Sequence, residues 1–142
     1  LRGEDLPLYG DGMQERDWLF VEDHCCALET LLFEGLPGES YHLGSQIVRT
    51  NLEVAQQVCT QIDRQQTAHP GESKERITFV EDRPGHDHRY ALDCGKMERL
   101  FGWRPTISFE EGIATTVQWY LKNPQWIETV CQEYQGNRIG LL

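Results

Sequence analysis

Only four short segments of this 142-residue chain have the composition of β-strands, and longer helical patterns separate them. The β-prone segments are residues 6–9, 18–21, 40–43 and 77–80, of which the second could instead be an extended lead-in to a helix. Strands that alternate with helices predict a mixed α/β fold. Four short strands are too few to build a self-sufficient doubly wound sheet. We therefore expect an α/β chain with few short strands and four to five helices.

Helices are predicted in five stretches. Their expected bounds are 23–33, 50–64, 93–101, 109–123 and about 126–134. Asp23 and Asp93 are expected to cap two of these helices, because a side-chain oxygen at a helix start accepts a hydrogen bond from a free backbone N–H. Two Ser/Thr-x-x-Glu patterns, at 50–53 and 108–111, fit capping boxes at two further helix starts. The polar stretch 65–75 is expected to be a loop.

The charge of the chain argues against several kinds of partner. Asp and Glu outnumber Lys and Arg by 23 to 13, which gives a formal net charge of −10. A nucleic-acid backbone favours a basic protein face, so no nucleic-acid partner is expected. No apolar run approaches the roughly 18 residues of a membrane span, and the polar N-terminal residues do not resemble a signal peptide. No membrane location is therefore expected.

The five cysteines are an odd number and include no Cys-x-x-Cys pair. This pattern favours free, largely buried thiols in a reducing compartment over a disulfide framework. A zinc site would need convergent ligand spacings that the sequence does not contain. We therefore expect a cytoplasmic protein without a metal site.

The stretch 7–12, followed by Arg16, is the first candidate for ligand binding. The flat ring of Tyr9 beside an extended backbone could support a nucleobase, and Arg16 could meet a phosphate. The alternative is a solvated turn with a surface ion pair between Arg16 and Asp17, and the residues alone favour that alternative.

The stretch 82–89 is the second candidate. Pro84 fixes one backbone dihedral and Gly85 frees the next, so the turn presents its polar side chains in a defined way. Its basic side chains are Arg83, His86, His88 and Arg89. Such a concentration of positive charge in an acidic chain suits a diphosphate, and a charged surface loop is the alternative. The His-x-His pair lacks a third ligand, so no metal is expected there.

No catalytic or cofactor-binding pattern occurs in the sequence. No Gly-x-Gly-x-x-Gly or Gly-x-x-Gly-x-x-Gly phosphate loop follows a predicted strand, so no NAD site is expected. No Tyr is followed four residues later by Lys, and no Gly-x-Ser-x-Gly elbow is present. We expect the chain to be inactive as an enzyme on its own.

Taken in order, these segments resemble the extended short-chain dehydrogenase/reductase family, and within it most closely the dTDP-glucose 4,6-dehydratases. The resemblance extends from Leu6 to about Trp126. Arg-Asp-Trp at 16–18 before Val-Glu-Asp at 21–23, and Gly-Trp-x-Pro at 102–105, are shared by many sugar-nucleotide relatives. The Asp-Arg-Pro-Gly-His-Asp loop at 82–87 is more specific to these dehydratases.

The resemblance implies that residues 1–142 are a C-terminal substrate-binding domain, with segments that would complete a Rossmann half in the full-length family. It implies that the pyrimidine end of the substrate lies against Pro7, Leu8 and Tyr9, the diphosphate at Arg16, and another part of the nucleotide at Asn51. The loop of Asp82, Arg83, Pro84, Gly85 and His86 would close over the nucleotide and its phosphates, with Arg83 as the strongest contact. The chain departs from the family at 44–49, which is poor in glycine, and at His88, where Arg is common.

The resemblance also implies the chemistry of the full-length enzymes, which are NAD-dependent lyases. They take a hydride from C4 of the sugar, eliminate water across C5–C6 and return the hydride to C6. This converts dTDP-glucose to dTDP-4-keto-6-deoxyglucose for deoxysugar (rhamnose-type) biosynthesis. The NAD-binding glycines and the catalytic residues belong to an N-terminal Rossmann half that this chain is expected to lack.

We therefore expect a partner for the apolar side chains that the missing half would cover, either that half or a second copy of the chain. These side chains are Leu28, Leu31, Leu32, Tyr41 and Leu43. Two alternatives stay open for the function. The chain could be the C-terminal part of another sugar-nucleotide epimerase or dehydratase, or a non-catalytic remnant that acts as a nucleotide-binding or assembly module.

Overall fold

The structure is a computed structural model that describes residues 3–66 and 71–133. The strands are β1 (Leu6–Tyr9), β2 (Glu15–Asp17), β3 (Val48–Thr50) and β4 (Ile77–Val80). The helices are α1 (Val21–Glu34), α2 (Asn51–Gln66), α3 (Gly95–Phe101), α4 (Phe109–Lys122) and α5 (Pro124–Glu133), with a 3-10 turn, η1 (Ser73–Arg76), before β4. The predicted α/β class with few short strands and five helices is confirmed for the described residues.

The strands form two separate pairs. β1 and β4 are parallel, with Leu6 opposite Ile77 and Tyr9 opposite Val80. β2 and β3 are antiparallel, with Arg16 opposite Arg49. Pro7 is tolerated in β1 because, among the described residues, this strand has a partner on one side only, so a missing N–H costs no ladder bond.

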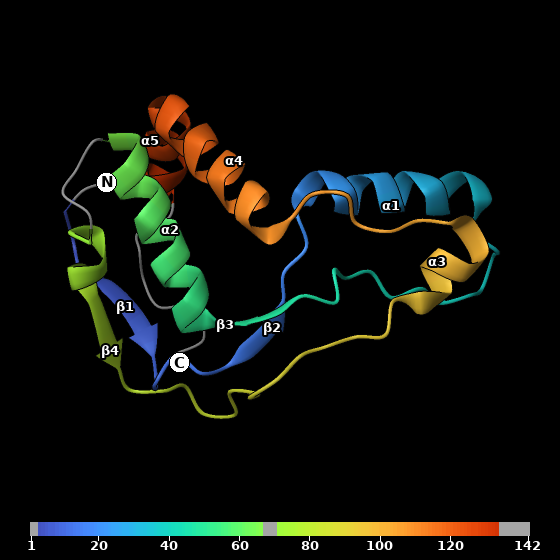
Figure 1. Cartoon of the computed structure of the whole chain (residues 1–142), viewed down its shortest axis with the longest axis horizontal. Coiled ribbons are helices and arrows are strands. Elements are labelled where there is room, and N and C mark those ends of the chain that lie inside the picture. Colours follow the sequence, from blue (N-terminus) through green and yellow to red (C-terminus); the bar gives the residue numbers. More distant parts are fainter. Residues whose placement is uncertain (1–2, 67–70, 134–142) are drawn as a thin grey trace.

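The core lies where α2 crosses α4. Val54 and Cys59 on α2, and Phe109 and Val117 on α4, are buried. Figure 1 shows α2, α4, α5 and the β1–β4 pair gathered at one end of the molecule, with α1 and α3 at the other. Few elements cover α1, and only Asp23 and Ala27 of its residues are buried.

Both predicted capping boxes are present. Ser108 and Glu111 exchange hydrogen bonds at the start of α4. Thr50 and Glu53 do the same where α2 begins, with the Glu53 N–H donating to the Thr50 hydroxyl over 3.1 Å. The structure therefore confirms the two helix starts that rested on this local pattern.

The predicted cap at Asp23 is wrong. Helix α1 begins two residues earlier, at Val21, and its N-cap Phe20 makes no side-chain capping bond. The Asp23 carboxylate instead accepts hydrogen bonds from the N–H and hydroxyl of Thr106 and from the N–H of Ile107. Burial by itself would raise the pKa of Asp23, but these hydrogen bonds hold the pKa below its ordinary value. Asp23 therefore ties α1 to the segment that precedes α4.

The predicted strand at 40–43 is also wrong, because the segment has no regular structure. Its groups contact α3 instead: Lys96 donates to the Ser40 carbonyl over 2.8 Å, and the Tyr41 ring packs on Phe101 at 5.6 Å between ring centroids. The segment 18–20 is a lead-in to α1 rather than a strand. Asp93 accepts from the Gly95 N–H, but Cys94 occupies the N-cap position of α3.

All five cysteines are free, as expected, but they are not largely buried. Cys59 and Cys94 are buried, whereas Cys25 and Cys26 on α1 are exposed. The prediction of buried thiols is wrong for this adjacent pair because α1 is covered on one side only. Among the described residues, no cluster of ligating side chains could hold a metal ion. None of the described helices combines the length and apolarity needed to cross a bilayer. Residues 67–70 of the predicted loop lie outside the described residues.

Candidate functional site

The parallel pairing of β1 with β4 brings the two candidate stretches together. The chain leaves both strands at the same edge, where the Gly10 N–H donates to the Val80 carbonyl over 2.9 Å. Ligands of α/β proteins commonly bind beyond the carboxyl ends of parallel strands. The turn after β1 and the loop after β4 therefore occupy a position suited to a ligand, at the lower left of Figure 1.

Arg16, on β2, is bound to the loop that follows β4. Its Nη2 donates to the Asp87 carbonyl over 2.9 Å, and its guanidinium lies 4.8 Å from the centre of the Tyr90 ring. The surface ion pair between Arg16 and Asp17 that local chemistry favoured is absent. Asp17 instead accepts from the N–H and hydroxyl of Ser45. Arg16 thus holds one side of the site in place.

The Asp82–His86 segment is a turn organised by its own aspartate. The Asp82 carboxylate accepts from Nδ1 of His86 over 2.7 Å and from the Arg83 N–H over 2.8 Å. The hydrogen bond from His86 is the main reason that the pKa of Asp82 lies below its ordinary value. Gly85 has a φ of 68°, which favours glycine over other residues. The His86 ring meets the Tyr9 ring edge-on, with 6.3 Å between the two ring centroids.

Arg83 projects from this turn and is exposed. Its guanidinium forms no hydrogen bond or ion pair with the described residues, in contrast to that of Arg16. Tyr90 donates to the Asp87 carboxylate, which raises the pKa of its phenol, while the charges of Arg16 and Arg83 act in the opposite direction. Both guanidiniums therefore lie close enough to influence the same phenol. Arg83 is the cation of this pair that is available to an anionic ligand.

The start of α2 borders the same region. The Asn51 N–H donates to the Gln14 carbonyl over 3.0 Å, and the Leu52 N–H donates to the Gly12 carbonyl over 2.9 Å. These bonds fix the turn after β1 against a helix N-terminus, where the helix dipole favours negative charge. Because side chains alternate along a strand, Pro7 and Tyr9 share one face of β1 and Leu8 lies on the other. An added Cβ at Gly12 would meet the Leu8 side chain at 2.5 Å, so Leu8 packs toward this turn.

Gln14 belongs to this site but was not among the predicted residues. It is buried, and its Nε2 donates to Oδ2 of Asp82 over 3.0 Å. One signal in the sequence could have suggested it: Gln14 and Arg16 are two residues apart, so they project to the same side of an extended chain.

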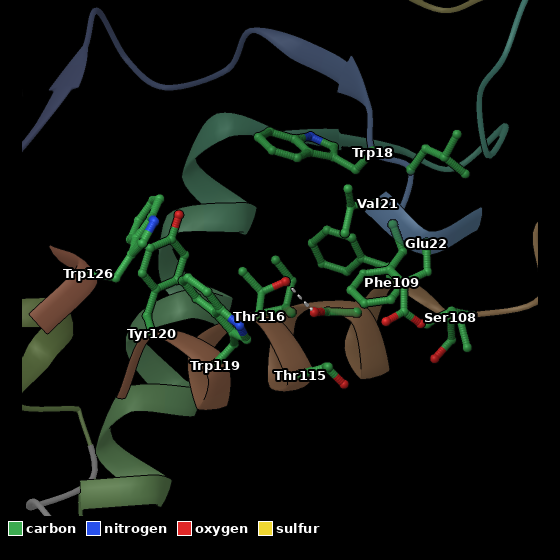
Figure 2. Close-up of a pocket in the computed structure, with 15 residues that line it drawn as sticks. Trp18, Val21, Glu22, Ser108, Phe109, Thr115, Thr116, Trp119, Tyr120 and Trp126 are labelled. Carbon is green, nitrogen blue, oxygen red and sulfur yellow. Dashed lines mark hydrogen bonds between the residues drawn. The ribbon is translucent and has the colours of Figure 1, made fainter. Parts of the chain in front are cut away.

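A large cavity lies elsewhere in the described part of the chain, and none of the predicted site residues lines it. It has a volume of about 620 Å³ and is bounded by the start of α1 and by α4 and α5. Figure 2 shows Trp18 on one side of it and Phe109, Trp119 and Trp126 among the side chains opposite. The Nε1 of Trp18 is buried without a hydrogen-bond partner among the described residues.

Comparison with protein families identifies the chain. The model of the family described as GDP-mannose 4,6 dehydratase matches residues 1–116. The chain belongs to the GDP-mannose 4,6 dehydratase family.

The curated relatives of this dehydratase-family chain confirm the predicted resemblance. It is 49% identical to a dTDP-glucose 4,6-dehydratase of Xanthomonas campestris pv. campestris over 99% of its own length and 40% of the relative's. A dTDP-glucose 4,6-dehydratase of Neisseria meningitidis serogroup B is 46% identical over 99% of this chain and 41% of the relative. The chain therefore spans about 40% of the length of these relatives and matches their C-terminal portion.

Solved structures agree with this assignment. The dTDP-glucose 4,6-dehydratase of Bacillus anthracis, in complex with NAD, has a TM-score of 0.76 and 45% identity, over 87% of this chain and 37% of that one. The enzyme of Streptomyces venezuelae, with NAD and TYD bound, has a TM-score of 0.73 and 42% identity, over 87% and 36% of the two chains. The described residues of the dehydratase-family chain thus have the fold of part of these enzymes.

Two strand-to-helix junctions of the described residues lack the turn that holds a dinucleotide such as the NAD of those relatives. A dinucleotide is held where a glycine-rich turn leads from a strand into a helix N-terminus. Here β2 leads into α1 through Trp18, Leu19 and Phe20, and β3 passes directly into α2. Neither junction contains glycine, so neither offers a cradle for a dinucleotide.

Proposed function

We propose that this chain is the substrate-binding part of a dTDP-glucose 4,6-dehydratase and binds a dTDP-linked sugar at the carboxyl edge of β1 and β4. In this proposal residues 1–142 act as one substrate-binding domain in the cytoplasm. The observation that supports it most is the meeting of Arg16, the free guanidinium of Arg83 and the start of α2 at one edge. A diphosphate requires such a convergence of positive charge and N–H donors.

The base would lie beside Tyr9. Tyr9 and Pro7 share one face of β1, and the His86 ring meets Tyr9 edge-on, which leaves an aromatic surface next to the cationic group. A pyrimidine stacked there would place its attached phosphates toward Arg83. Asn51, at the start of α2, would contact the nucleotide from the opposite side.

The chain's own residues would bind and orient the sugar nucleotide, and the remaining part of the dehydratase would carry out the reaction. NAD, where the full-length relatives hold it, supplies hydride transfer. The chain contains no Gly-x-Gly-x-x-Gly loop and no Tyr-x-x-x-Lys pair. We therefore infer that it does not convert dTDP-glucose without that remaining part.

Calorimetric titration of the whole chain with dTDP, UDP and GDP tests the proposed binding. We expect dTDP to bind more tightly than UDP and GDP, and Arg83→Ala to weaken dTDP binding about tenfold or more. Arg104→Ala is the matched control, because Arg104 is exposed and pairs with Glu98 away from the site. A preference for UDP or GDP would assign the chain to another branch of the family. Failure of wild type to bind any of the three would favour a non-catalytic remnant.

The exposed side of α1 supports a partner for the chain. Val21, Cys25, Leu28 and Leu32 recur at spacings of four, three and four residues, so they form one stripe along the helix. Leu32 is 78% exposed and Leu28 is 49% exposed. The buried residues Asp23 and Ala27 lie on the other side of the helix. An apolar stripe of this kind is typical of a surface that another element covers.

We propose that the remaining part of a dehydratase, which the relatives have and this chain does not span, covers this stripe. Glu22 and Glu29 lie beside the stripe, and α1 carries no Lys or Arg. A second copy of α1 would bring like charges together, so the charge pattern disfavours self-association.

Light scattering with size-exclusion chromatography tests this partner. The chain is measured alone and mixed with the unmatched portion of the Xanthomonas relative. We expect a one-to-one complex that Leu32→Ser weakens, while Gln57→Ser, an exposed change on α2, leaves it intact. A dimer of the chain alone that Leu32→Ser dissociates would establish a second copy as the partner instead.

A further inference from the structure

Gln14 is a buried side chain that the proposed nucleotide contacts do not account for. It lies in the turn between β1 and β2 and is only 6% exposed. Its Nε2 donates to Oδ2 of Asp82, 68 positions later in the sequence. Its backbone carbonyl accepts from the N–H of Asn51. Gln14 therefore connects all three segments that supply the candidate contacts: the β1–β2 turn, the start of α2 and the loop after β4.

The buried amide of Gln14 carries an energetic cost. Its Oε1 is buried and has no hydrogen-bond partner among the described residues. Burying a polar atom without a partner is unfavourable, and an apolar side chain of similar shape would avoid that penalty. The donor half of the amide, which reaches Asp82, is thus the part with a defined contact.

Both oxygens of the Asp82 carboxylate are engaged within the protein. Oδ2 accepts from Gln14, and Oδ1 accepts from the Arg83 N–H and from His86. A carboxylate is a poor direct contact for an anionic diphosphate because the two charges repel. Asp82 is therefore better placed to orient the turn from which Arg83 projects than to touch the phosphates.

The backbone leaves room for this contact at Gly10. Gly10 has a φ of 61°, and an added Cβ would lie 3.0 Å from Oδ2 of Asp82 and 3.2 Å from Nε2 of Gln14. The pair thus occupies the space that a side chain at position 10 would need.

We propose that Gln14 is a positioning residue of the nucleotide-sugar site. Through Asp82 it fixes the 82–86 turn in the orientation that presents Arg83 to the diphosphate. This inference rests on the proposed function for the identity of the ligand, whereas the Gln14–Asp82 contact exists in the protein without one.

Two substitutions separate positioning from the filling of space. Gln14→Met keeps the length of the side chain and removes the donor, so dTDP binding should weaken about tenfold at every pH. Gln14→Glu places a second carboxylate beside Asp82 and should bind weakly at pH 8. At pH 5 a protonated Glu can again donate to Asp82, so its affinity relative to wild type should recover. A residue that only fills space predicts wild-type affinity for Gln14→Met and no recovery for Gln14→Glu.

Among the described residues, the titratable and charged groups near position 14 include Asp82, Arg83 and His86 on the loop after β4 and Arg89, which pairs with Glu15. Its own segment carries Asp11, Glu15 and Arg16. The first two residues of α2, Asn51 and Leu52, contribute none. Wild type is titrated in parallel at each pH, so the pH dependence that these groups give wild type is divided out of the ratio of affinities.

Hydrogen exchange of the Arg83 backbone amide, measured by NMR without ligand, gives an independent readout. This N–H donates to Asp82, and we expect it to exchange about tenfold faster in Gln14→Met than in wild type. If wild type does not bind dTDP, the proposed function fails and this exchange rate alone decides the positioning role. Where wild type binds dTDP, an unchanged exchange rate and an unchanged dTDP affinity in Gln14→Met would together overturn the positioning role.

Discussion

The carboxylate of Asp23 on α1 accepts hydrogen bonds from both the backbone N–H and the hydroxyl of Thr106, 83 residues later in the chain. The same carboxylate also accepts from the Ile107 N–H over 3.0 Å. These three bonds join α1 to the segment that leads into α4. Asp23 therefore stabilises the position of a helix that has little other cover.

Asp23→Asn should lower the free energy of unfolding by about 2–3 kcal/mol at pH 7, because a charged acceptor of three buried bonds is lost. The lowered pKa of Asp23 fixes the pH dependence. Its contribution is fully present above the unfolded-state pKa near 4 and is lost as pH falls through the folded-state pKa. Urea unfolding at pH 7 and pH 3 measures this, with the exposed neighbour Glu22→Gln as control. An equal difference between Asp23→Asn and wild type at both pH values would contradict it.

Gly10→Ala should destabilise the protein more than Gly38→Ala. Both glycines have a positive φ, so both substitutions carry the same backbone penalty of about 1 kcal/mol. An added Cβ at Gly10 meets Asp82, whereas one at Gly38 meets no atom of the described residues within 4 Å apart from its chain neighbours. We expect about 1–2 kcal/mol of additional loss for Gly10→Ala, together with weaker dTDP binding. Urea unfolding and titration of the two variants side by side give the comparison, and equal losses would refute the crowding at Gly10.

Arg16→Lys should weaken dTDP binding about three- to tenfold even though the positive charge is kept. A single ammonium cannot reach the carbonyls of Asp87 and His88 and also lie over the Tyr90 ring, so the loop loses an anchor. Arg104→Lys is the matched control, since Arg104 is exposed and pairs with Glu98 away from the site. Full affinity in Arg16→Lys would mean that Arg16 acts only as a charge.

Cys25 and Cys26 should react with a thiol reagent at pH 8 much faster than Cys59 and Cys94. The first two are exposed on α1. Burial raises the pKa of the Cys59 and Cys94 thiols, which lowers their thiolate fraction in addition to restricting access. Peptide mapping by mass spectrometry after timed labelling gives the four rates. Rapid labelling of Cys59 in the native protein would show that the α2–α4 core opens readily.

The elements that could be predicted from the sequence are those whose signals are local. The capping boxes at 50–53 and 108–111 involve residues three positions apart, and they locate two helix starts correctly. The β-prone segment 40–43 failed because strand formation depends on a neighbouring strand, and here α3 is its neighbour. Asp23 has the side chain of an N-cap, but its partners are 83 and 84 residues away, where no local pattern can reveal them.

The residues of the candidate site also divide into those that the sequence indicates and those that only distant contacts reveal. The residues themselves suggested Arg16 and the 82–89 loop, the resemblance added Asn51, and the structure brings them to one edge. Neither the sequence nor the resemblance could reveal that Arg16 is bound to backbone carbonyls, or that the Arg83 guanidinium has no partner among the described residues, because those facts depend on the path of the loop after β4. Gln14 was missed for the same reason, since its contact with Asp82 spans 68 positions.

The parallel pairing of β1 with β4 also determines when the site can form. Tyr9 belongs to the start of the chain, whereas its partner Val80 follows α1, β3 and α2. Closing so long a loop is slow compared with forming a helix, so the helices should form first and the strand pair later. During synthesis this edge cannot assemble until β4 and the loop beyond it have left the ribosome. A ligand that binds this edge would therefore accelerate none of the early steps and would stabilise only the last contacts to form.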